Sequence, residues 1–235
     1  MATVNHSKLA TQIVYFDVEG RENLEEVLRV LQRVLKKREE LRPLKIVILT
    51  AHGEGPVIAY NELRKYEPKI IAVTFPPSFS VKRVNGDRYF PKISENILKF
   101  FKGIEIDVVV PPTLPFDFID GMEAHNQQVK LVRDTISIFG AGFALCIQAV
   151  LRACDMGRIE SGERVIAVSG DTAGLFIAST TGKFLNGKGG IAIQEIFCKP
   201  RGLNISRPTP PRPMLIEGAT KSDMGDEASL GLKKS

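Results

Sequence analysis

A glycine-containing turn follows one of the most apolar runs of the sequence. The run 45–50 consists mainly of Ile, Val and Leu, and it leads into Gly53, Gly55 and Pro56. This order predicts a strand that passes directly into a helix. Glycines leave backbone N–H groups accessible and a helix start is positively polarised, so the turn can bind a phosphate. The lysine of a P-loop is absent, and glycines that only make the turn tight explain the pattern equally well.

A second polar turn follows another apolar run, at 164–169. Its hydroxyls and accessible amides suit a phosphate or a sugar, whereas the Asp171 carboxylate repels phosphate and accepts hydrogen bonds from hydroxyls. A plain turn at Gly170 and Asp171 is the alternative interpretation. The ligand-binding residues predicted from the strand ends are Thr50, His52, Gly53, Gly55, Thr74, Ser169, Gly170, Asp171, Thr172 and Gly174.

Three side chains in these turns can transfer protons at neutral pH, either directly or after a modest shift of their pKa: His52, Glu54 and Asp171. The sequence does not place them at a catalytic distance, and a structural or solvated histidine is the alternative. We expect no metal site, because the acidic residues and histidine of 117–125 are irregularly spaced. The three cysteines form no close pair, which argues against a disulfide framework or a zinc site.

The elements that position these residues alternate between strand and helix. Uninterrupted Val and Ile runs separated by helices are typical of a parallel sheet covered on both faces. We therefore predict a three-layer α/β fold with a mostly parallel sheet, whose ligands bind beyond the C-terminal ends of the strands. Strand patterns lie at 13–16, 45–50, 70–74, 106–110, 164–169 and 191–198, and helix patterns at 24–35, 56–66, 93–101 and 128–156, the last broken at 139–142.

Charge and composition exclude several classes of function. The net charge is +5, but the basic run 36–38 is followed at once by Glu39 and Glu40. No basic stripe is interleaved with aromatic residues, so we expect no nucleic-acid partner. No apolar run is long enough to span a bilayer, and the first residues lack a secretion-signal pattern. We therefore expect no membrane partner and a cytoplasmic location.

Composition also suggests how the chain is divided. We expect a flexible N-terminus over residues 1–11 and one α/β domain over residues 12–205. Residues 206–235 contain four closely spaced prolines followed by polar residues without periodicity. This composition predicts a disordered tail rather than a second domain.

Several motifs resemble the C-terminal domain of pyruvate kinases. The strand and turn at 45–53, the strand at 66–74 and the glycine-ended strand at 162–170 follow the order of that domain. Residues 13–16 and 20–23, together with 155–157 and 196–201, are similar to a family of small stand-alone proteins described as pyruvate kinase α/β-domain-like. The likeness covers about residues 13–201.

The resemblance implies a ligand-binding domain without pyruvate kinase activity. Pyruvate kinases perform their chemistry in a separate TIM barrel, and this chain offers no counterpart of its metal-binding carboxylates and catalytic lysine. Their C-terminal domain often binds a sugar bisphosphate on loops that correspond to 52–55 and 170–174. Here Ala51, His52, Gly53 and Glu54 replace the hydroxyl-rich phosphate loop. The stand-alone relatives imply FMN or another nucleotide instead, and oligomer contacts of pyruvate kinase domains imply a homo-oligomer.

Three functions stay open on the sequence. The first is a module that binds a phosphate-bearing small molecule at the strand ends. The second is an enzyme that uses this ligand as cofactor or substrate, with His52 or Asp171 in acid–base roles. The third is a non-catalytic oligomerisation or regulatory domain.

Overall fold

The computed structural model describes residues 12–42, 45–82, 87–116 and 127–202. The predicted terminal segments 1–11 and 206–235 lie outside the described residues, as does the acidic stretch 117–126. Within the described part, no helix is both long and apolar enough to cross a bilayer.

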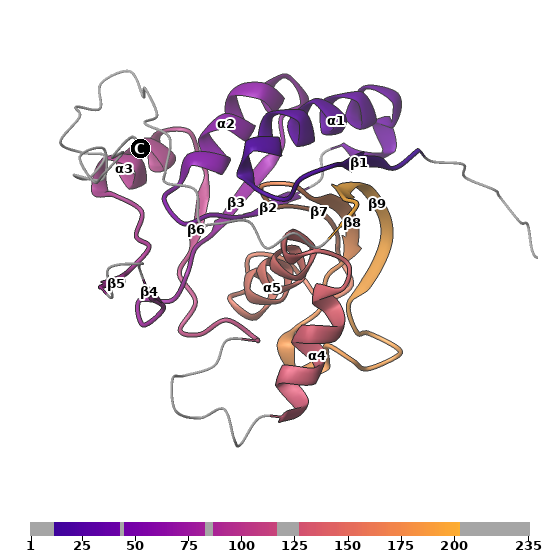
Figure 1. Cartoon of the computed structure of the whole chain (residues 1–235). Coiled ribbons are helices and arrows are strands. Elements are labelled where there is room, and N and C mark those ends of the chain that lie inside the picture. The colour runs from indigo at the N-terminus through magenta and orange to yellow at the C-terminus, as the bar shows by residue number, and fades with distance from the viewer. Residues whose placement is uncertain (1–11, 43–44, 83–86, 117–126, 203–235) are drawn as a thin grey trace, which may run out of the picture.

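A seven-stranded mixed sheet forms the centre of the protein, in the spatial order β1-β9-β8-β7-β2-β3-β6 (Figure 1). β8 pairs antiparallel with both of its neighbours, and all other pairings are parallel. Among the described strands of this sheet only β8 is reversed, which confirms the mostly parallel α/β sheet. The strands are β1 (Val14–Phe16), β2 (Lys45–Leu49), β3 (Lys69–Val73), β6 (Asp107–Val109), β7 (Arg164–Val168), β8 (Ala173–Ile177) and β9 (Ala192–Pro200).

Helices cover both faces of the sheet (Figure 1). α1, α2 and α3 contribute to one apolar core and α5 to the other, so the sheet lies between two helical layers. The expected break in the segment 128–156 is confirmed, because α4 and α5 are separate helices. The helices are α1 (Leu24–Lys37), α2 (Glu54–Leu63), α3 (Glu95–Gly103), α4 (Gln127–Ser137) and α5 (Ala141–Asp155), with 3-10 turns at Arg21–Asn23, Glu39–Leu41, Arg64–Tyr66 and Thr181–Lys183.

Alternation along the central strand β2 supplies both cores. Ile46 and Ile48 belong to the core that contains Leu28 of α1, whereas Val47 belongs to the core that contains Leu151 of α5. Successive side chains of a strand point to opposite faces of the sheet. A strand buried on both faces must therefore be apolar at every position, which explains the uninterrupted run in the sequence.

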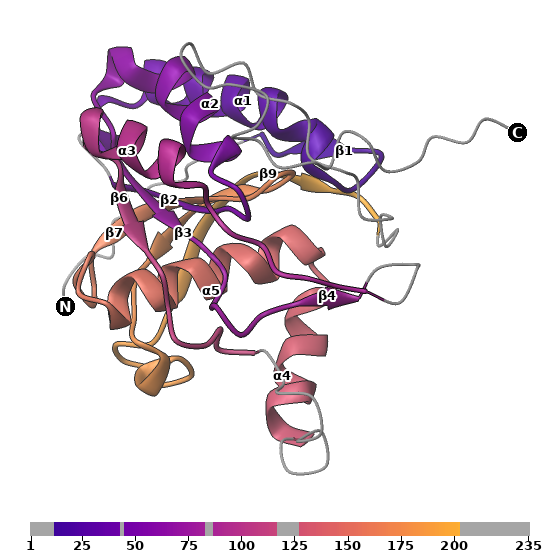
Figure 2. The same ribbon diagram turned by 90° about the vertical axis from the view of Figure 1, so that its left-hand side faces the viewer.

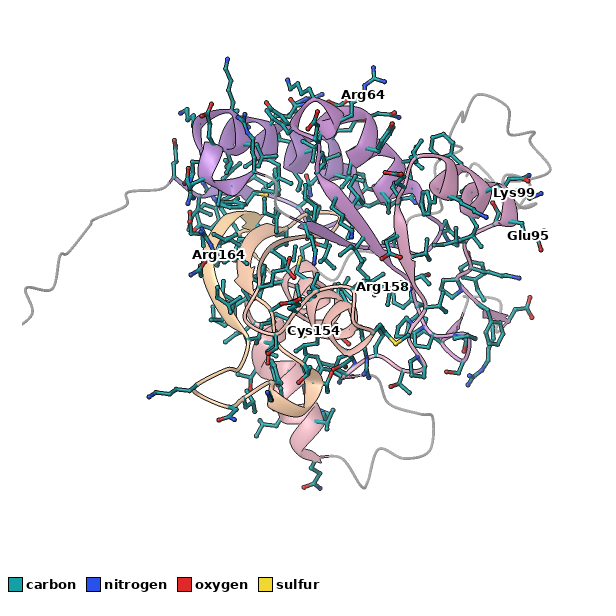
Figure 3. All side chains as sticks on the ribbon, turned by 180° about the vertical axis from the view of Figure 1, so that it is seen from behind. Arg64, Glu95, Lys99, Cys154, Arg158 and Arg164 are labelled. Carbon is teal, nitrogen blue, oxygen red and sulfur yellow. The ribbon has the colours of Figure 1, made fainter. Side chains whose placement is uncertain are left out.

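The outer surfaces of the helices carry the charged side chains. Arg64, Glu95 and Lys99 extend outward from the layer formed by α2 and α3 (Figure 3). α1 has Glu25 in its first turn and Lys37 in its last, an arrangement that the helix dipole favours. The interleaved charges of the sequence are thus distributed over solvated helix faces.

The order of the strands reverses between β2 and β7. From β2 the chain proceeds through α2 and α3 to β3 and β6, toward one edge of the sheet. It then returns through α4 and α5, on the opposite face, to β7 on the other side of β2 (Figure 2). The C-terminal ends of β2 and β7 therefore define a topological switch point, where open α/β sheets bind ligands.

Two elements are missing from the sequence prediction. β8 follows β7 through a tight turn in which the Ser169 N–H donates to the Thr172 carbonyl at 2.9 Å. The predicted turn after 164–169 thus leads into a strand, and pairing with β7 and β9 fixes this short run of five residues. The other element is an arm within the predicted loop 76–91, formed by β4 (Val81–Lys82) and β5 (Arg88–Tyr89).

Replacing Gly53 by alanine is expected to destabilise the fold by about 2–5 kcal/mol. Its φ is +90°, and a Cβ there would lie 2.6 Å from Ile97 Cγ2 and 3.1 Å from Phe101 Cζ of α3. The measurement is urea unfolding followed by circular dichroism. Gly103→Ala is the matched control, because no atom lies within 4 Å of its added Cβ. Equal free energies of unfolding for the two variants would contradict this account.

Candidate functional site

The structure brings the two predicted turns to the same edge of the sheet. β2 and β7 are parallel neighbours whose last paired residues are Ile48 and Val168. Thr50 and Gly170 each follow two residues after this pair, so the turns lie side by side at the switch point. The pairing of β2 with β7 thus brings together two turns that are more than 100 residues apart in the sequence.

The β2–α2 turn is held by Thr50. Its Oγ1 accepts a hydrogen bond from the Gly53 N–H at 2.9 Å, and Gly53 adopts the left-handed conformation as the N-cap of α2. A glycine N-cap has no side chain that can accept from the first helical amides. The amino end of α2 therefore begins without a side-chain cap, at Glu54 and Gly55.

Backbone conformation and packing require a glycine at only one of the two glycine positions of this turn. Gly53 is required by its positive φ and by the close approach of α3. A Cβ on Gly55 would lie 3.4 Å from Ile48 Cγ2 and 3.8 Å from Leu24 Cδ2, which are ordinary van der Waals distances. Packing and backbone conformation therefore leave room for a side chain at Gly55.

His52 lies between the turn and the β4–β5 arm. Its Nε2 lies 2.6 Å from the Tyr89 hydroxyl oxygen, and its Nδ1 lies 3.3 Å from the Lys92 carbonyl oxygen. The half-buried imidazole is thus held by two groups that come from one segment beyond β3. Tyr89 was not predicted, and only the pairing of the arm reveals it.

Asp171 joins the β7–β8 turn to the loop after β1. Its Oδ2 accepts from the Gly20 N–H at 2.9 Å, and its Oδ1 accepts from the Thr172 hydroxyl at 2.8 Å and the Ser169 hydroxyl at 3.4 Å. All three residues of this turn are buried. Both carboxylate oxygens are used within the protein, so the contacts assign Asp171 a structural role.

The amino end of α5 rests on the same carboxylate. A Cβ on Gly142 would lie 1.9 Å from Asp171 Oδ1 and 2.5 Å from Ser169 Oγ. Only a glycine permits this approach, because any side chain would displace the helix or the turn. The positive end of the helix dipole then stabilises the buried carboxylate.

Glu19, which the sequence analysis did not single out, is a second buried acid at this helix end. Desolvation by burial raises the pKa of Glu19, a backbone hydrogen bond from Ala141 lowers it, the nearby Asp171 carboxylate raises it, and Lys199 lowers it. Two acidic side chains thus occupy the amino end of α5. This end of α5 is therefore unfavourable for binding an anion.

The loop after β1 spans the two turns. The Gly20 N–H bonds Asp171, and the Arg21 guanidinium lies 3.4 Å from the Glu54 carboxylate at the start of α2. A Cβ on Gly170 would lie 2.7 Å from Arg21 Cα, so this glycine is required by the crossing of the loop. The rule that ligand residues follow strand ends also selects this loop, because β1 runs parallel to β9.

Two predicted ligand residues remain, Thr74 and Gly174. Thr74 directly follows β3, where its N–H donates to the Val109 carbonyl, and its buried Oγ1 has no hydrogen-bond partner among the described residues. Gly174 lies inside β8, and a Cβ there would lie 2.6 Å from the Glu195 carbonyl oxygen. Close strand pairing thus explains Gly174 without a ligand.

The cysteines are buried and form no disulfide. Burial is the largest influence on each thiol and raises the pKa of Cys198 to about 12. It also raises the pKa of Cys146 and Cys154. The thiols therefore stay protonated near neutral pH and act as small buried apolar groups.

Within the described ranges, no group of three or more His, Cys, Asp and Glu side chains is placed to hold a metal ion. A hollow near the N-terminal ends of β2 and β7, beside Leu35 and Tyr66, has a volume of about 200 Å³ including open solvent. Because that figure includes open solvent, the enclosed part of the hollow is far smaller than a small-molecule site.

No protein-family model matches the chain. The pyruvate kinase-like assignment therefore stays a prediction from the motifs.

Glu19→Gln is expected to gain stability relative to the native chain as the pH rises. The folded-state pKa of Glu19 lies above its ordinary value, so the folded protein binds the proton more tightly than the unfolded chain. Ionisation between the unfolded-state pKa, about 4.3, and the folded-state pKa then lowers the free energy of unfolding. The glutamine keeps an acceptor for Ala141 and removes this loss. Urea titrations across this window measure the difference, and one that does not change with pH would refute the assignment.

Asp171→Asn is expected to lower the free energy of unfolding by about 1–3 kcal/mol at neutral pH. The asparagine amide group would meet the donors of Gly20, Thr172 or Ser169 in place of one acceptor oxygen. Chemical unfolding at one pH, with Glu19→Gln as the matched isosteric change, measures the effect. Equal stability of Asp171→Asn and the native protein would contradict the structural role of this carboxylate.

Proposed function

We propose that the protein binds a phosphate-bearing small molecule at the switch point between β2 and β7. The phosphate would lie at the β2–α2 turn, where the helix begins without a side-chain cap. The observation that carries the proposal is that residue 55 is a glycine although the fold leaves room for a side chain there. A ligand that approaches the first amides of α2 closely supplies the reason that packing does not.

The charges at the two helix ends favour α2 over α5. The amino end of α5 is occupied by Asp171 and Glu19, whereas the amino end of α2 has Arg21 beside it. Arg21 pairs with Glu54, and both side chains are partly exposed. A phosphate could take this guanidinium in a charge-assisted, bidentate contact while Glu54 turns to solvent.

The ligand class follows from the motifs that resemble pyruvate kinase C-terminal domains. The stand-alone relatives implied by that likeness make FMN, or another nucleotide, the first ligand to test. A nucleotide also carries hydroxyls and a planar ring, for which Glu54, His52 and Tyr89 offer polar and aromatic partners near the turn. We propose no pyruvate kinase activity for these 235 residues.

An enzymatic role is the second candidate, and the His52–Tyr89 contact favours it. A distance of 2.6 Å between Nε2 and the hydroxyl oxygen suits proton exchange between the two groups. His52 would then be the general acid or base, and Tyr89 would orient it. The buried and fully bonded Asp171 is a poor candidate for the same role.

The direct test is to purify the protein from cells, denature it, and identify the released molecules by absorbance and mass spectrometry. A flavin in near-stoichiometric amount supports the proposal and leads to redox assays. Another phosphate ester supports the site with a different ligand. Release of nothing, together with no heat of binding for FMN or inorganic phosphate, would overturn it.

Gly55→Ala is expected to stabilise the fold and weaken the ligand complex. Alanine in the first turn of α2 adds helix propensity, up to about 1 kcal/mol, and meets only ordinary contacts. Its methyl group, which would contact Ile48 and Leu24, would also crowd the first amides of α2 to which we assign the phosphate, so affinity for the co-purified ligand or FMN should fall about tenfold, near 1.4 kcal/mol. Thermal unfolding and titration calorimetry measure the two effects. Loss of stability, or unchanged affinity, would contradict the assignment of Gly55.

Arg21→Gln is expected to weaken binding of the same ligand roughly tenfold or more, because a charge-assisted hydrogen bond is lost. The matched control is Arg29→Gln, whose arginine pairs with Glu26 on the exposed face of α1, away from the turn. The measurement is titration calorimetry at two salt concentrations, since a charge contact weakens with salt. Equal affinities for the two variants would exclude Arg21 from the site.

A further inference from the structure

Four exposed apolar side chains lie around the amino end of α5. Tyr15, Val18, Ile138 and Phe139 are between 46% and 63% exposed. They come from β1 with its following loop and from the turn between α4 and α5. We call these four side chains the β1–α5 patch.

Contacts between their neighbours bring these segments together. Gly140 directly follows Phe139, and a Cβ built on it would lie 3.8 Å from Glu19 Oε1 and 4.0 Å from Pro200 Cδ. Tyr15 pairs in register with Lys199, the residue before Pro200. The α4–α5 turn therefore touches the strand pair β1–β9, and the patch is one surface rather than four scattered side chains.

Two cationic side chains lie beside Tyr15 in the patch. The Lys199 ammonium lies 5.8 Å and the Arg201 guanidinium 6.0 Å from the centre of the Tyr15 ring. An apolar surface with these two cations beside it fits a short apolar segment that is followed by an acidic residue. Exposed apolar clusters rimmed by charge are typical of interaction sites.

The size of the patch decides what kind of partner it can hold. Four partly exposed side chains offer far less than the roughly 800 Å² per partner of a stable protein–protein complex. A segment tethered to the same chain needs less area, because the tether supplies an effective concentration on the order of millimolar. A tethered segment is therefore favoured over a separate protein or a second copy.

We propose that the β1–α5 patch binds residues 214–217 of the same chain, the sequence Met-Leu-Ile-Glu. Three consecutive apolar residues followed by a glutamate match the apolar surface and the Lys199 and Arg201 side chains beside it. The described chain ends at Gly202, two residues beyond Pro200, which lies against the α4–α5 turn. The intervening residues reach up to about 40 Å when extended, which is ample for the segment to return to the patch. The inference is independent of the ligand site.

The test is hydrogen–deuterium exchange of the full chain, read by mass spectrometry on peptides that cover residues 13–20 and 136–143. Leu215→Asp should speed amide exchange in both peptides by about threefold or more, because it removes the cover over the patch. Leu230→Asp is the matched control, since it introduces the same charge elsewhere in the C-terminal residues. Phe139→Ser should reciprocally speed exchange in a peptide that covers residues 210–219.

The opposite outcomes are distinct. Unchanged exchange in Leu215→Asp, with unfolding temperatures equal to those of the native chain, would overturn the proposal. Equal acceleration by Leu230→Asp would overturn it as well, because the effect would then be one of charge alone. Protection that disappears on dilution, with a dimer mass by light scattering, would assign the patch to a second copy of the chain instead.

Discussion

The fit of α5 onto the β7–β8 turn is the contact on which the strand-end region depends. A Cβ on Gly142 would lie only 1.9 Å from Asp171 Oδ1, so helix and turn can meet only because no side chain intervenes. The buried carboxylate is stabilised by the Gly20 N–H, by the Thr172 hydroxyl and by the amino end of the helix. Loss of any of these groups would leave a buried charge with fewer partners, which is costly in a protein interior. The positions of α5, the turn and the loop after β1 are therefore set together.

This arrangement gives the two helix amino ends of the switch point different chemistry. At α5 the protein supplies its own acids, Asp171 and Glu19, and burial, together with the nearby Asp171 carboxylate, raises the pKa of Glu19. At α2 the N-cap is a glycine, and the Glu54 carboxylate of the first turn is paired with the Arg21 guanidinium. The same loop after β1 serves both ends, since consecutive residues contact α5, Asp171 and Glu54. For this reason our proposal places an anionic ligand at α2 rather than at α5, and under it a change in this loop would affect stability and binding together.

The glycines around the switch point differ in whether the fold requires them. Gly53, Gly142, Gly170 and Gly174 each have a positive φ or a neighbour closer than 3.0 Å to an added Cβ. Gly55 has neither. Glycine in a helix costs stability relative to alanine, and Gly55 also stands at the start of α2 at the switch point, which is why our proposal assigns to it the close approach of a ligand. The motif alone could not show this difference, because the distances come from α3, the β7–β8 turn and β9.

The sequence by itself determined the class of fold and the edge of the sheet at which a site should lie. Continuous apolar runs such as 45–49 require burial on both faces, and the Gly-Pro start of α2 is a local signal. β8 and the β4–β5 arm could not be predicted, because short strands are stabilised by partners distant in the chain rather than by their own propensity. Likewise, only the tertiary structure shows that Glu19 and Arg21 lie over the turns, that Tyr89 contacts His52, and that both carboxylate oxygens of Asp171 accept hydrogen bonds within the protein. Hydrogen bonds and close approaches of this kind join residues that are far apart in the sequence, and no local pattern records them.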